Sequence, residues 1–488
     1  MSQIDCFIPY ESFGQVEQTL QQLQTSSAIN QVYLLANDKA AHDKNLPDYP
    51  LIPVKRITNT NALRQIIATA QADYVLLYLK TLPLQIGYLA LERMLQIAGD
   101  TQAGMLYADS YRMVDGNKKL HPLIDYQKGS LRDDFDFGSL LLFRTDALKN
   151  ILQEMSEDFE YAGLYDLRLK VSQKYSIEHV NEYLYSEIEM DRRTSGEKLF
   201  DYVDPKNRDI QLEMERACTH HLKAIKAYLA PRFDEIHFDK LSFPVEASVI
   251  IPVYNRVRTI EDAIQSVLKQ KTGFSFNLII IDNHSTDGTT DIIRRYATDK
   301  RIIHLIPDRV DLGIGGCWNV GIDHKQCGKF SVQLDSDDVY SDENTLQTMV
   351  NAFYEQQCGM VVGSYRMTNF AMQTIPPGLI DHREWTEENG RNNALRINGL
   401  GAPRAFYTPL LRQLHVPNTS YGEDYALGLA VSRHYRIGRV YDVVYLCRRW
   451  EDNSDAALDM QKINLNNLYK DRIRTWEVEA RQQMNRIG

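Results

Sequence analysis

The sequence predicts an α/β protein with two similar domains in tandem, joined by a helical connector. At 488 residues the chain is longer than one ordinary domain. Strand-like apolar runs alternate with amphipathic helical segments in both halves, which is typical of folds built on a largely parallel sheet. Short sequence matches also recur between the two halves in the same order, and such a series indicates an internal duplication.

The alternation of strands and helices is clearest in the second half. Short apolar runs there predict strands, and segments with apolar residues three or four apart predict the helices between them. The strands are expected at 247–251, 278–281, 302–306 and 330–334, and the helices at 259–269, 289–296 and 317–324.

The repeat rests on three pairs of matching segments. The offset between partners changes slowly along the chain, as loop insertions would produce. The pairs are 8–10 with 251–254, 104–113 with 359–367, and 171–177 with 431–437. A charged helical stretch separates the two copies. We therefore predict a first domain over 1–190, a connector over 191–240 and a second domain over 241–488.

Composition and charge argue against several classes of protein. The net charge of −10 disfavours binding to nucleic acid or to an anionic membrane. No stretch resembles a signal peptide, and no apolar run approaches the ~18 residues of a membrane span. The six cysteines are scattered without a C-x-x-C pair, so we expect reduced cytoplasmic thiols rather than disulfides or zinc ligands.

Three carboxylates follow the strand at 330–334 within four residues: Asp335, Asp337 and Asp338. Like charges this close repel one another unless a cation joins them. Oxygen ligands at the end of a strand suit Mg²⁺ or Mn²⁺ carrying the phosphates of a nucleotide. A calcium EF-hand loop is excluded, because Tyr340 stands where its glycine is required. The cluster therefore predicts a metal-dependent transferase with a phosphate-bearing donor.

Three motifs in the second half resemble family 2 glycosyltransferases of the GT-A fold. They are Ser-Val-Ile-Ile-Pro-Val-Tyr-Asn at 248–255, Ile-Ile-Ile-Asp-Asn-His-Ser-Thr-Asp-Gly at 279–288 and Asp-Ser-Asp-Asp at 335–338. The resemblance covers about 245–455 and implies two tandem GT-A-like domains, given the repeat. It also implies that Asp335 and Asp337 form a DXD motif. Asp337 would then coordinate Mn²⁺ or Mg²⁺, and Asp335 would contact the metal or the ribose.

The resemblance implies further donor contacts at the strand ends. Asp282 would accept hydrogen bonds from the base or the ribose, and Arg448 or Arg449 could clamp the diphosphate. Asp282 could instead cap the next helix, and Pro252 could simply form a strand-to-helix turn. In the family's N-x-G-x-x-x-A-R-N-x-G element, Trp318 replaces the arginine. The donor-binding residues implied in this way are Pro252, Val253, Tyr254, Asn255, Asp282, Asn319, Asp335, Ser336 and Arg449.

The segment Tyr421-Gly422-Glu423-Asp424 resembles the E-D element of the family. The resemblance implies that Asp424 is the catalytic base, which removes the proton of the acceptor hydroxyl. Glu423 would contact the acceptor. The alternative is that the two carboxylates form an N-terminal cap for a helix beginning near Tyr425.

Acceptor contacts are expected mainly from the segment 382–404. The candidates are His382, Arg383, Trp385, Arg404 and Trp450. A polar surface excursion or a structural tryptophan would show the same pattern. Leu446 replaces the glutamine of the Q-x-x-R-W signature of processive synthases, so the sequence does not favour processivity.

The first half lacks the corresponding chemical groups. Leu79-Lys80-Thr81-Leu82 aligns with the carboxylate cluster, and Leu164 aligns with Asp424. We therefore expect a degenerate copy that supports the second domain structurally. Binding of the glycan acceptor by the first domain stays open as an alternative.

The sequence as a whole predicts a non-processive, inverting and metal-dependent glycosyltransferase. We expect a cytoplasmic protein, with a peripheral position on the inner face of the membrane left open. It would transfer a sugar from a nucleotide-diphosphate donor to a glycan or glycolipid hydroxyl. A UDP-sugar is favoured and GDP-mannose stays open, as does homo-oligomerisation. One alternative is a non-catalytic carbohydrate- or nucleotide-binding protein. Another is a sugar-phosphate nucleotidyltransferase, although the Gly-rich loop that it would need is absent from 252–256.

Overall fold

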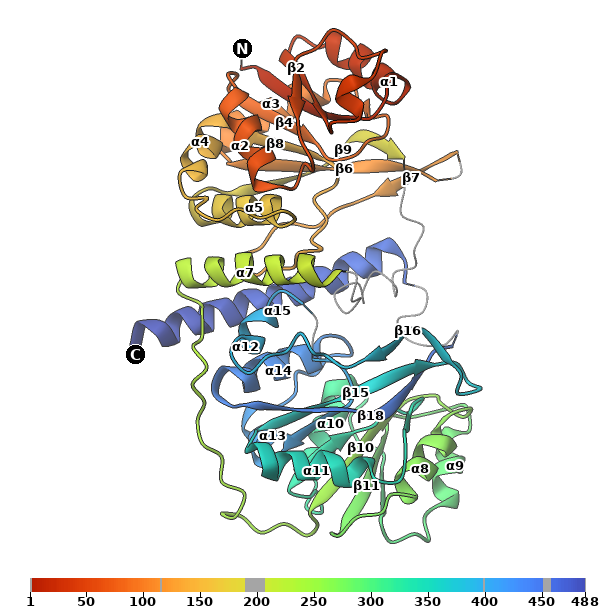
Figure 1. Cartoon of the computed structure of the whole chain (residues 1–488). Helices are drawn as coiled ribbons and strands as arrows, with labels where there is room; N and C mark the ends of the chain where they lie inside the picture. Colours follow the sequence, from red (N-terminus) through yellow and green to blue (C-terminus); the bar gives the residue numbers. More distant parts are fainter. Residues whose placement is uncertain (1, 115, 189–206, 398–399, 451–457, 488) are drawn as a thin grey trace. The chain divides into compact units, whose positions relative to one another are not determined.

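The computed structural model describes residues 2–114, 116–188, 207–397, 400–450 and 458–487 (Figure 1). These residues form two compact units. The first unit contains 2–188, 207–228 and 459–487, and the second contains 229–397, 400–450 and residue 458. In sequence, the second unit is therefore inserted into the first.

The first unit is built on a mixed sheet. Its strand order is β3-β2-β1-β4-β8-β6-β9-β5, with β7 paired to β6. Strands β3, β2, β1 and β4 run parallel to one another, and β8 is antiparallel to both β4 and β6. The strands are β1 Ile4–Tyr10, β2 Ile29–Ala36, β3 Leu51–Pro53, β4 Tyr74–Tyr78, β5 Gln85–Ile86, β6 Met105–Val114, β7 Asn117–His121, β8 Leu140–Arg144 and β9 Ile177–Ile188.

The helices of the first unit include two that lie outside the first half of the sequence. They are α1 Phe13–Gln24, η1 Ala40–His42, α2 Thr60–Thr69, α3 Ala90–Thr101, α4 Thr145–Leu152, α5 Gly163–Lys174, α7 Arg208–Ala224 and α15 Met460–Ile487. Glu213 of α7 accepts hydrogen bonds from the backbone N–H groups of residues 160–162. Asp471 of α15 accepts from Ser130 and Arg132. These contacts attach both helices to the first unit.

The second unit repeats the sheet of the first. Its order is β12-β11-β10-β13-β17-β15-β18-β14, with β16 paired to β15. The strands are β10 Ala247–Val253, β11 Phe276–Asp282, β12 Ile302–Leu305, β13 Phe330–Gln333, β14 Val339–Tyr340, β15 Met360–Thr368, β16 Thr374–Ile380, β17 Arg404–Tyr407 and β18 Ile437–Arg448. The helices are α8 Ile260–Leu268, α9 Thr289–Arg295, α10 Ile314–Asp323, α11 Thr345–Gln356, α12 Gly390–Asn393, α13 Thr408–Leu414 and α14 Glu423–His434.

The two sheets match strand for strand, so the predicted pair of tandem α/β domains is confirmed. The register agrees as well, because Ile4 pairs with Tyr74 where Ala247 pairs with Phe330. The end of β4 therefore corresponds to the end of β13. Helices α5 and α14 correspond in the same way, and both contain twelve residues.

The helices and strands predicted for the second half are all present. Strand β11 is buried along its whole length, and its apolar run 278–281 is typical of a strand covered on both faces. Helix α10 begins three residues earlier than predicted, at Ile314. The backbone passes so close to another segment here that a Cβ on Gly315 would lie 1.8 Å from the carbonyl oxygen of Pro417. Only glycine fits at that position.

The connector predicted over 191–240 contains α7, and its residues 191–206 lie outside the described part of the chain. None of the helices in the described ranges has the length and apolarity needed to cross a membrane.

Candidate active site

Three parallel strands of the second unit bring their carboxyl ends to one edge of the sheet. Strand β10 lies between β11 and β13, and Val253 at its end pairs with Asp282. The carboxylate cluster follows β13 at this same edge. Ligands of open α/β sheets bind outside the carboxyl ends of the strands, so the candidate active site lies here.

Arg404 joins the cluster to the predicted base. Strand β17 runs antiparallel to β13 and pairs Ala405 with Val332, which places Arg404 beside Gln333. The Arg404 Nε donates to Gln333 Oε1 at 2.9 Å, and the Gln333 amide donates to Asp335 at 2.8 Å. The guanidinium also forms an ion pair with Asp424. A buried cation thus connects two carboxylates that are distant in sequence.

Asp335 and Asp338 are held in a negative environment. Burial raises the pKa of Asp335; the Arg404 guanidinium opposes this rise and the Asp337 carboxylate adds to it. Burial, together with the charges of Asp337 and Asp335, raises the pKa of Asp338 well above its ordinary value. The backbone N–H of Arg448 donates to Asp338 at 2.7 Å. Burial and the neighbouring carboxylates therefore disfavour the ionised forms of Asp335 and Asp338.

Asp337 is the carboxylate of the cluster that faces aromatic and cationic groups. The Trp450 Nε1 donates to its Oδ2 at 3.4 Å, and the Arg256 Nε lies 3.8 Å from the same oxygen. The indole of Trp450 also packs against Phe370 and lies under the Arg258 guanidinium, 4.9 Å from ring centroid to Cζ. Trp450 thus occupies a place beside the cluster and not on a distant floor of the domain.

Glu423 and Asp424 are the first two residues of α14. Asp424 accepts a hydrogen bond from the backbone N–H of Tyr425 at 2.7 Å, so it does contribute to the start of the helix. Glu423 Oε2 is buried and has no hydrogen-bond partner among the described residues. Burial and the neighbouring Asp424 carboxylate raise the pKa of Glu423 to about 8. A carboxyl with this pKa carries a proton at neutral pH and can donate it.

The raised pKa of Glu423 predicts a pH-dependent stability. Between the unfolded pKa near 4.5 and the folded value near 8, the folded protein binds more protons, so stability falls as pH rises through this window. The variant Glu423→Gln lacks the titrating carboxyl and should not show this loss of stability. We expect the melting temperature of the variant minus that of wild type, measured by calorimetry, to be roughly 2–5 °C larger at pH 8 than at pH 5. Glu11→Gln, an exposed change in the first unit, is the control. A difference that is constant with pH would contradict the assignment.

The residues predicted to contact the base lie at the ends of β10 and β11. The Tyr254 ring is 56% exposed and open to a ligand. Asn255 has a positive φ of 50° and ties the two loops together, because its side chain accepts from the backbone N–H of Thr286 at 2.8 Å. Pro252 and Val253 are the last residues of β10.

Asp282 is fully buried and has several partners. Its Oδ1 accepts from the backbone N–H of Ser285 at 3.0 Å, Thr290 donates to its Oδ2, and the His304 Nε2 lies 3.4 Å away. Burial alone would raise the pKa of Asp282, but these hydrogen bonds hold it well below its ordinary value. The capping alternative therefore has direct support, since Asp282 holds the loop that leads into α9.

The remaining predicted donor contacts are Asn319, Ser336 and Arg449. The Asn319 amide donates to the carbonyl of Val416 at 2.7 Å and accepts from its N–H at 2.9 Å, so both of its polar groups fix the chain before α14. Ser336 is buried. The backbone N–H of Arg449 donates to the carbonyl of Thr368 at 2.8 Å.

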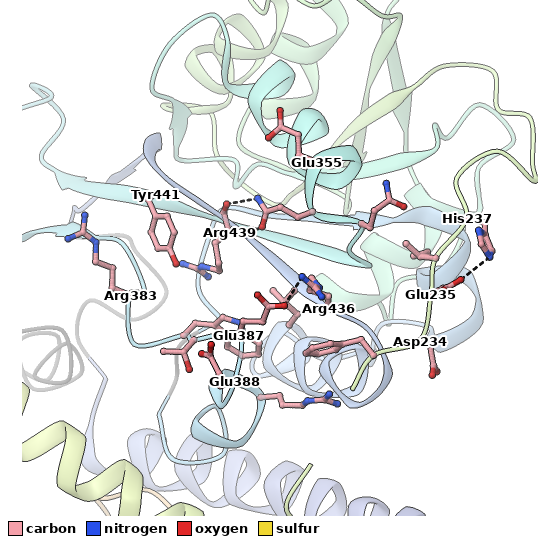
Figure 2. A pocket seen from close by; sticks show the side chains of 18 residues that line it. Asp234, Glu235, His237, Glu355, Arg383, Glu387, Glu388, Arg436, Arg439 and Tyr441 are labelled. Atoms are coloured by element: carbon pink, nitrogen blue, oxygen red, sulfur yellow. Dashed lines mark hydrogen bonds and ion pairs between the residues drawn. The ribbon is translucent and has the colours of Figure 1, made fainter. Parts of the chain in front are cut away.

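The predicted acceptor contacts fall in two places. Arg404 and Trp450 lie at the carboxylate cluster. Arg383 and Trp385 line a separate cavity (Figure 2). His382 is buried, with its Nδ1 3.2 Å from Glu384, and burial lowers its pKa. The segment 382–404 thus borders both the carboxylate cluster and the cavity.

The structure shows contacts of Arg448, a candidate for the diphosphate clamp, with the cluster itself, and it adds Tyr445 and Gln333, which the sequence did not identify as site residues. Arg448 is buried and donates from Nε to the carbonyl of Asp337 at 2.6 Å and from Nη1 to Asp262 at 2.7 Å. The Tyr445 hydroxyl accepts from the backbone N–H of Asp335 at 3.2 Å. Gln333 had a visible signal, since it and Ser331 are the two polar residues of an otherwise apolar run.

The carboxylates fit a metal ion only together with a substrate. In the part of the chain that the structure describes, no three or more His, Cys, Asp or Glu side chains are grouped to hold an ion by themselves. Asp335 and Asp337 offer two carboxylates, and ions such as Mg²⁺ are commonly bound by one or two carboxylates plus substrate phosphates and water. A cation would also relieve the repulsion that raises the pKa of Asp335.

The first unit replaces this charged network with apolar side chains. The register of β4 and β8 places Leu77, Leu141 and Leu79 where the second unit has Gln333, Arg404 and Asp335. With Leu164 at the position of Asp424, these leucines belong to one hydrophobic cluster. The nearby Lys80 forms an ion pair with the buried Glu187 at 2.8 Å. The first unit therefore has neither a base nor a metal-binding pair of carboxylates at the corresponding positions.

Comparison with known proteins agrees with the geometry. Residues 248–409 match the model of the family described as glycosyl transferase family 2. The chain is 32% identical over 120 residues to the putative teichuronic acid biosynthesis glycosyltransferase TuaG of Bacillus subtilis (strain 168), a match to 25% of this chain and 46% of TuaG. It is 25% identical over 235 residues to the UDP-Glc:alpha-D-GlcNAc-diphosphoundecaprenol beta-1,3-glucosyltransferase WfgD of Escherichia coli, covering 47% of this chain and 84% of WfgD.

Among solved structures, S. aureus TarS 1–349 in complex with UDP-GlcNAc is similar with a TM-score of 0.40 and 22% identity. The match covers 49% of this chain and 70% of that one. The chain spans about half the length of TuaG, the curated relative reported first above.

Proposed function

The chain carries a domain of glycosyl transferase family 2, and from this premise we propose that it transfers a sugar from a nucleotide-diphosphate donor to a glycan or glycolipid hydroxyl. One observation carries the proposal. The Arg404 guanidinium brings Asp424, at the start of α14, to the cluster after β13, through Gln333 and Asp335. A base for the acceptor and a site for the donor diphosphate thus adjoin each other.

Asp424 acts as the base in this mechanism. Its carboxylate accepts the proton of the acceptor hydroxyl while that oxygen attacks the anomeric carbon. The bond between the anomeric carbon and the diphosphate breaks, and its electron pair leaves with the nucleoside diphosphate. Attack from the face opposite the leaving group inverts the configuration. Arg404 orients the Asp424 carboxylate, and protonated Glu423 can donate a hydrogen bond to an acceptor oxygen.

Asp335 and Asp337 would hold a divalent ion, Mn²⁺ or Mg²⁺, together with the donor. Bound there, the ion would supply Lewis-acid neutralisation of the charge on the diphosphate. Tyr254 offers an exposed ring to the base at the same edge of the sheet. Arg256 lies near Asp337 and is a further cation within reach of the phosphates.

We favour a UDP-sugar as donor and a lipid-linked or polymeric glycan as acceptor. The support is the name of WfgD, which specifies a UDP-glucose donor and a diphosphoundecaprenol-linked acceptor. Such an acceptor would place the protein in the cytoplasm at the inner face of the membrane. The first unit, which lacks the charged network, would support the second structurally.

The donor is tested by thermal shift with UDP and GDP, each with and without Mn²⁺. We expect UDP with Mn²⁺ to stabilise the protein most, since a ligand at 100 times its Kd contributes about 2.7 kcal/mol. Slow hydrolysis of a UDP-sugar in the presence of Mn²⁺ should accompany binding. If neither nucleotide shifts the melting temperature and no UDP- or GDP-sugar is hydrolysed, the proposed function is refuted.

A further inference from the structure

The second unit contains a large cavity that lies away from the carboxylate cluster. Its volume is about 1060 Å³, at the upper end of the ~300–1,000 Å³ typical of ligand pockets. Its walls come from the chain at 233–237, the end of α11, the segment 383–391 and the start of β18 (Figure 2).

The register places this cavity and the active site at opposite edges of the sheet. Strands β13, β15 and β18 run in the same direction, and Met360 pairs with Ile437 at their amino ends. The carboxylates follow the carboxyl end of β13. Arg448, which contacts Asp338, is nine residues beyond Arg439 on β18. Strand β18 bulges here, and its partner β15 covers the same span in six residues, from Val362 to Thr368. At ~3.3 Å per residue, roughly 20 Å therefore separates Arg439 from the cluster.

The lining offers hydrogen-bond donors and acceptors of both charges. The Arg439 side chain is 8% exposed, and its Nε and Nη1 are buried without a hydrogen-bond partner among the described residues. The Arg436 guanidinium forms an ion pair with Glu387 at 2.7 Å, marked in Figure 2. Exposed carboxylates surround these arginines: Asp234, Glu235, Glu355, Glu387 and Glu388.

Aromatic rings complete the lining. The Phe233 ring lies 4.1 Å from the Arg391 guanidinium, measured from ring centroid to Cζ. Trp385 is packed tightly against Gly390, where a Cβ would come within 2.6 Å of the indole. Tyr441 is 48% exposed. The cavity therefore contains two aromatic side chains held by packing, Phe233 and Trp385, and a half-exposed one, Tyr441. All three lie beside charged hydrogen-bonding groups.

We propose that this cavity binds a neutral oligosaccharide, as a second saccharide site that holds an acceptor glycan far from its reacting end. A sugar hydroxyl both donates and accepts, so it can use carboxylate and guanidinium groups side by side. The lining carries four arginines and five carboxylates, so a phosphate or uronate would gain no net charge attraction there, whereas a neutral saccharide can use both kinds of group. The role of acceptor anchor rests on the proposed function, whereas saccharide binding itself does not.

Saccharide binding is tested by saturation-transfer NMR without nucleotide. The probes are defined neutral oligosaccharides of four to six glucose, galactose or N-acetylhexosamine residues, with a glycerol-phosphate oligomer as the anionic comparison. The double variant Arg436→Ala/Tyr441→Ala changes two partly exposed lining residues. Lys271→Ala is the control, because Lys271 is an exposed lysine with its own ion pair to Glu343 at 2.8 Å, outside the cavity.

We expect at least one neutral probe to bind wild type and Lys271→Ala equally, and to bind the double variant at least tenfold more weakly. The melting temperatures of the variants show whether each is folded. The inference is overturned if no neutral probe binds at millimolar concentration, if the glycerol-phosphate oligomer binds instead, or if the folded double variant binds as wild type does. If a neutral probe binds but no nucleotide shifts the melting temperature and no nucleotide sugar is hydrolysed, the saccharide site is supported and the proposed function is refuted.

Discussion

Asp424→Asn is expected to lower the turnover of sugar transfer by about 10²–10⁴, because asparagine cannot accept the proton of the acceptor hydroxyl. This range corresponds to about 2.7–5.4 kcal/mol of lost transition-state stabilisation. Donor binding should change little, since the amide keeps the size of the carboxylate and can still cap α14 through its carbonyl oxygen. Turnover and nucleotide affinity are measured separately, by steady-state kinetics and by thermal shift.

The control for this variant is Asp291→Asn, which changes a carboxylate that is also in the first turn of a helix but is exposed on α9. It should transfer sugar at the wild-type rate. Turnover of Asp424→Asn within threefold of wild type would remove Asp424 from the mechanism and leave it only the role of a helix cap.

Asp337→Ala is expected to abolish the Mn²⁺ dependence of UDP binding and to reduce donor hydrolysis by at least 10². The same substitution removes a negative charge that raises the pKa of Asp335 and Asp338. Without ligand the variant should therefore be at least as stable as wild type. A residue with only a structural role would show the reverse, with lower stability and an unchanged response to Mn²⁺.

The chain offers a matched control for Asp337 in its own first unit. Thr81 stands at the corresponding position after β4, where no carboxylate cluster exists. Thr81→Ala should leave the UDP and Mn²⁺ response as in wild type. An unchanged Mn²⁺-dependent shift in Asp337→Ala would mean that other groups hold the ion.

Much of the fold could be predicted from the sequence, because strands buried on both faces give long apolar runs and parallel pairing needs intervening helices. The alternation around β10, β11 and β13 shows both signals. The repeat was visible for a different reason: the matching segments at 8–10 and 251–254 lie at the ends of β1 and β10, where the same turn has to form.

The interior of the site could not be predicted in the same way. Arg404 reaches Asp424 because β17 pairs antiparallel with β13. The local sequence pattern does not indicate which distant strand pairs with β13. Asn319 matched a family position, yet its amide donates to and accepts from the backbone of Val416. The roles of such residues depend on which residues, distant in sequence, the fold brings into contact with them.

The interrupted first unit has a consequence for how the protein is synthesised. Its last helix, α15, supplies Asp471 to Ser130 and Arg132, but a ribosome makes this helix only after all of 229–458. Domains generally fold as units while the chain emerges. The second unit can therefore be complete first, although it is encoded later, and the first unit must wait with an uncovered surface near residues 127–132. Stop codons between 459 and 487 would then damage the amino-terminal half of the protein rather than the unit next to them.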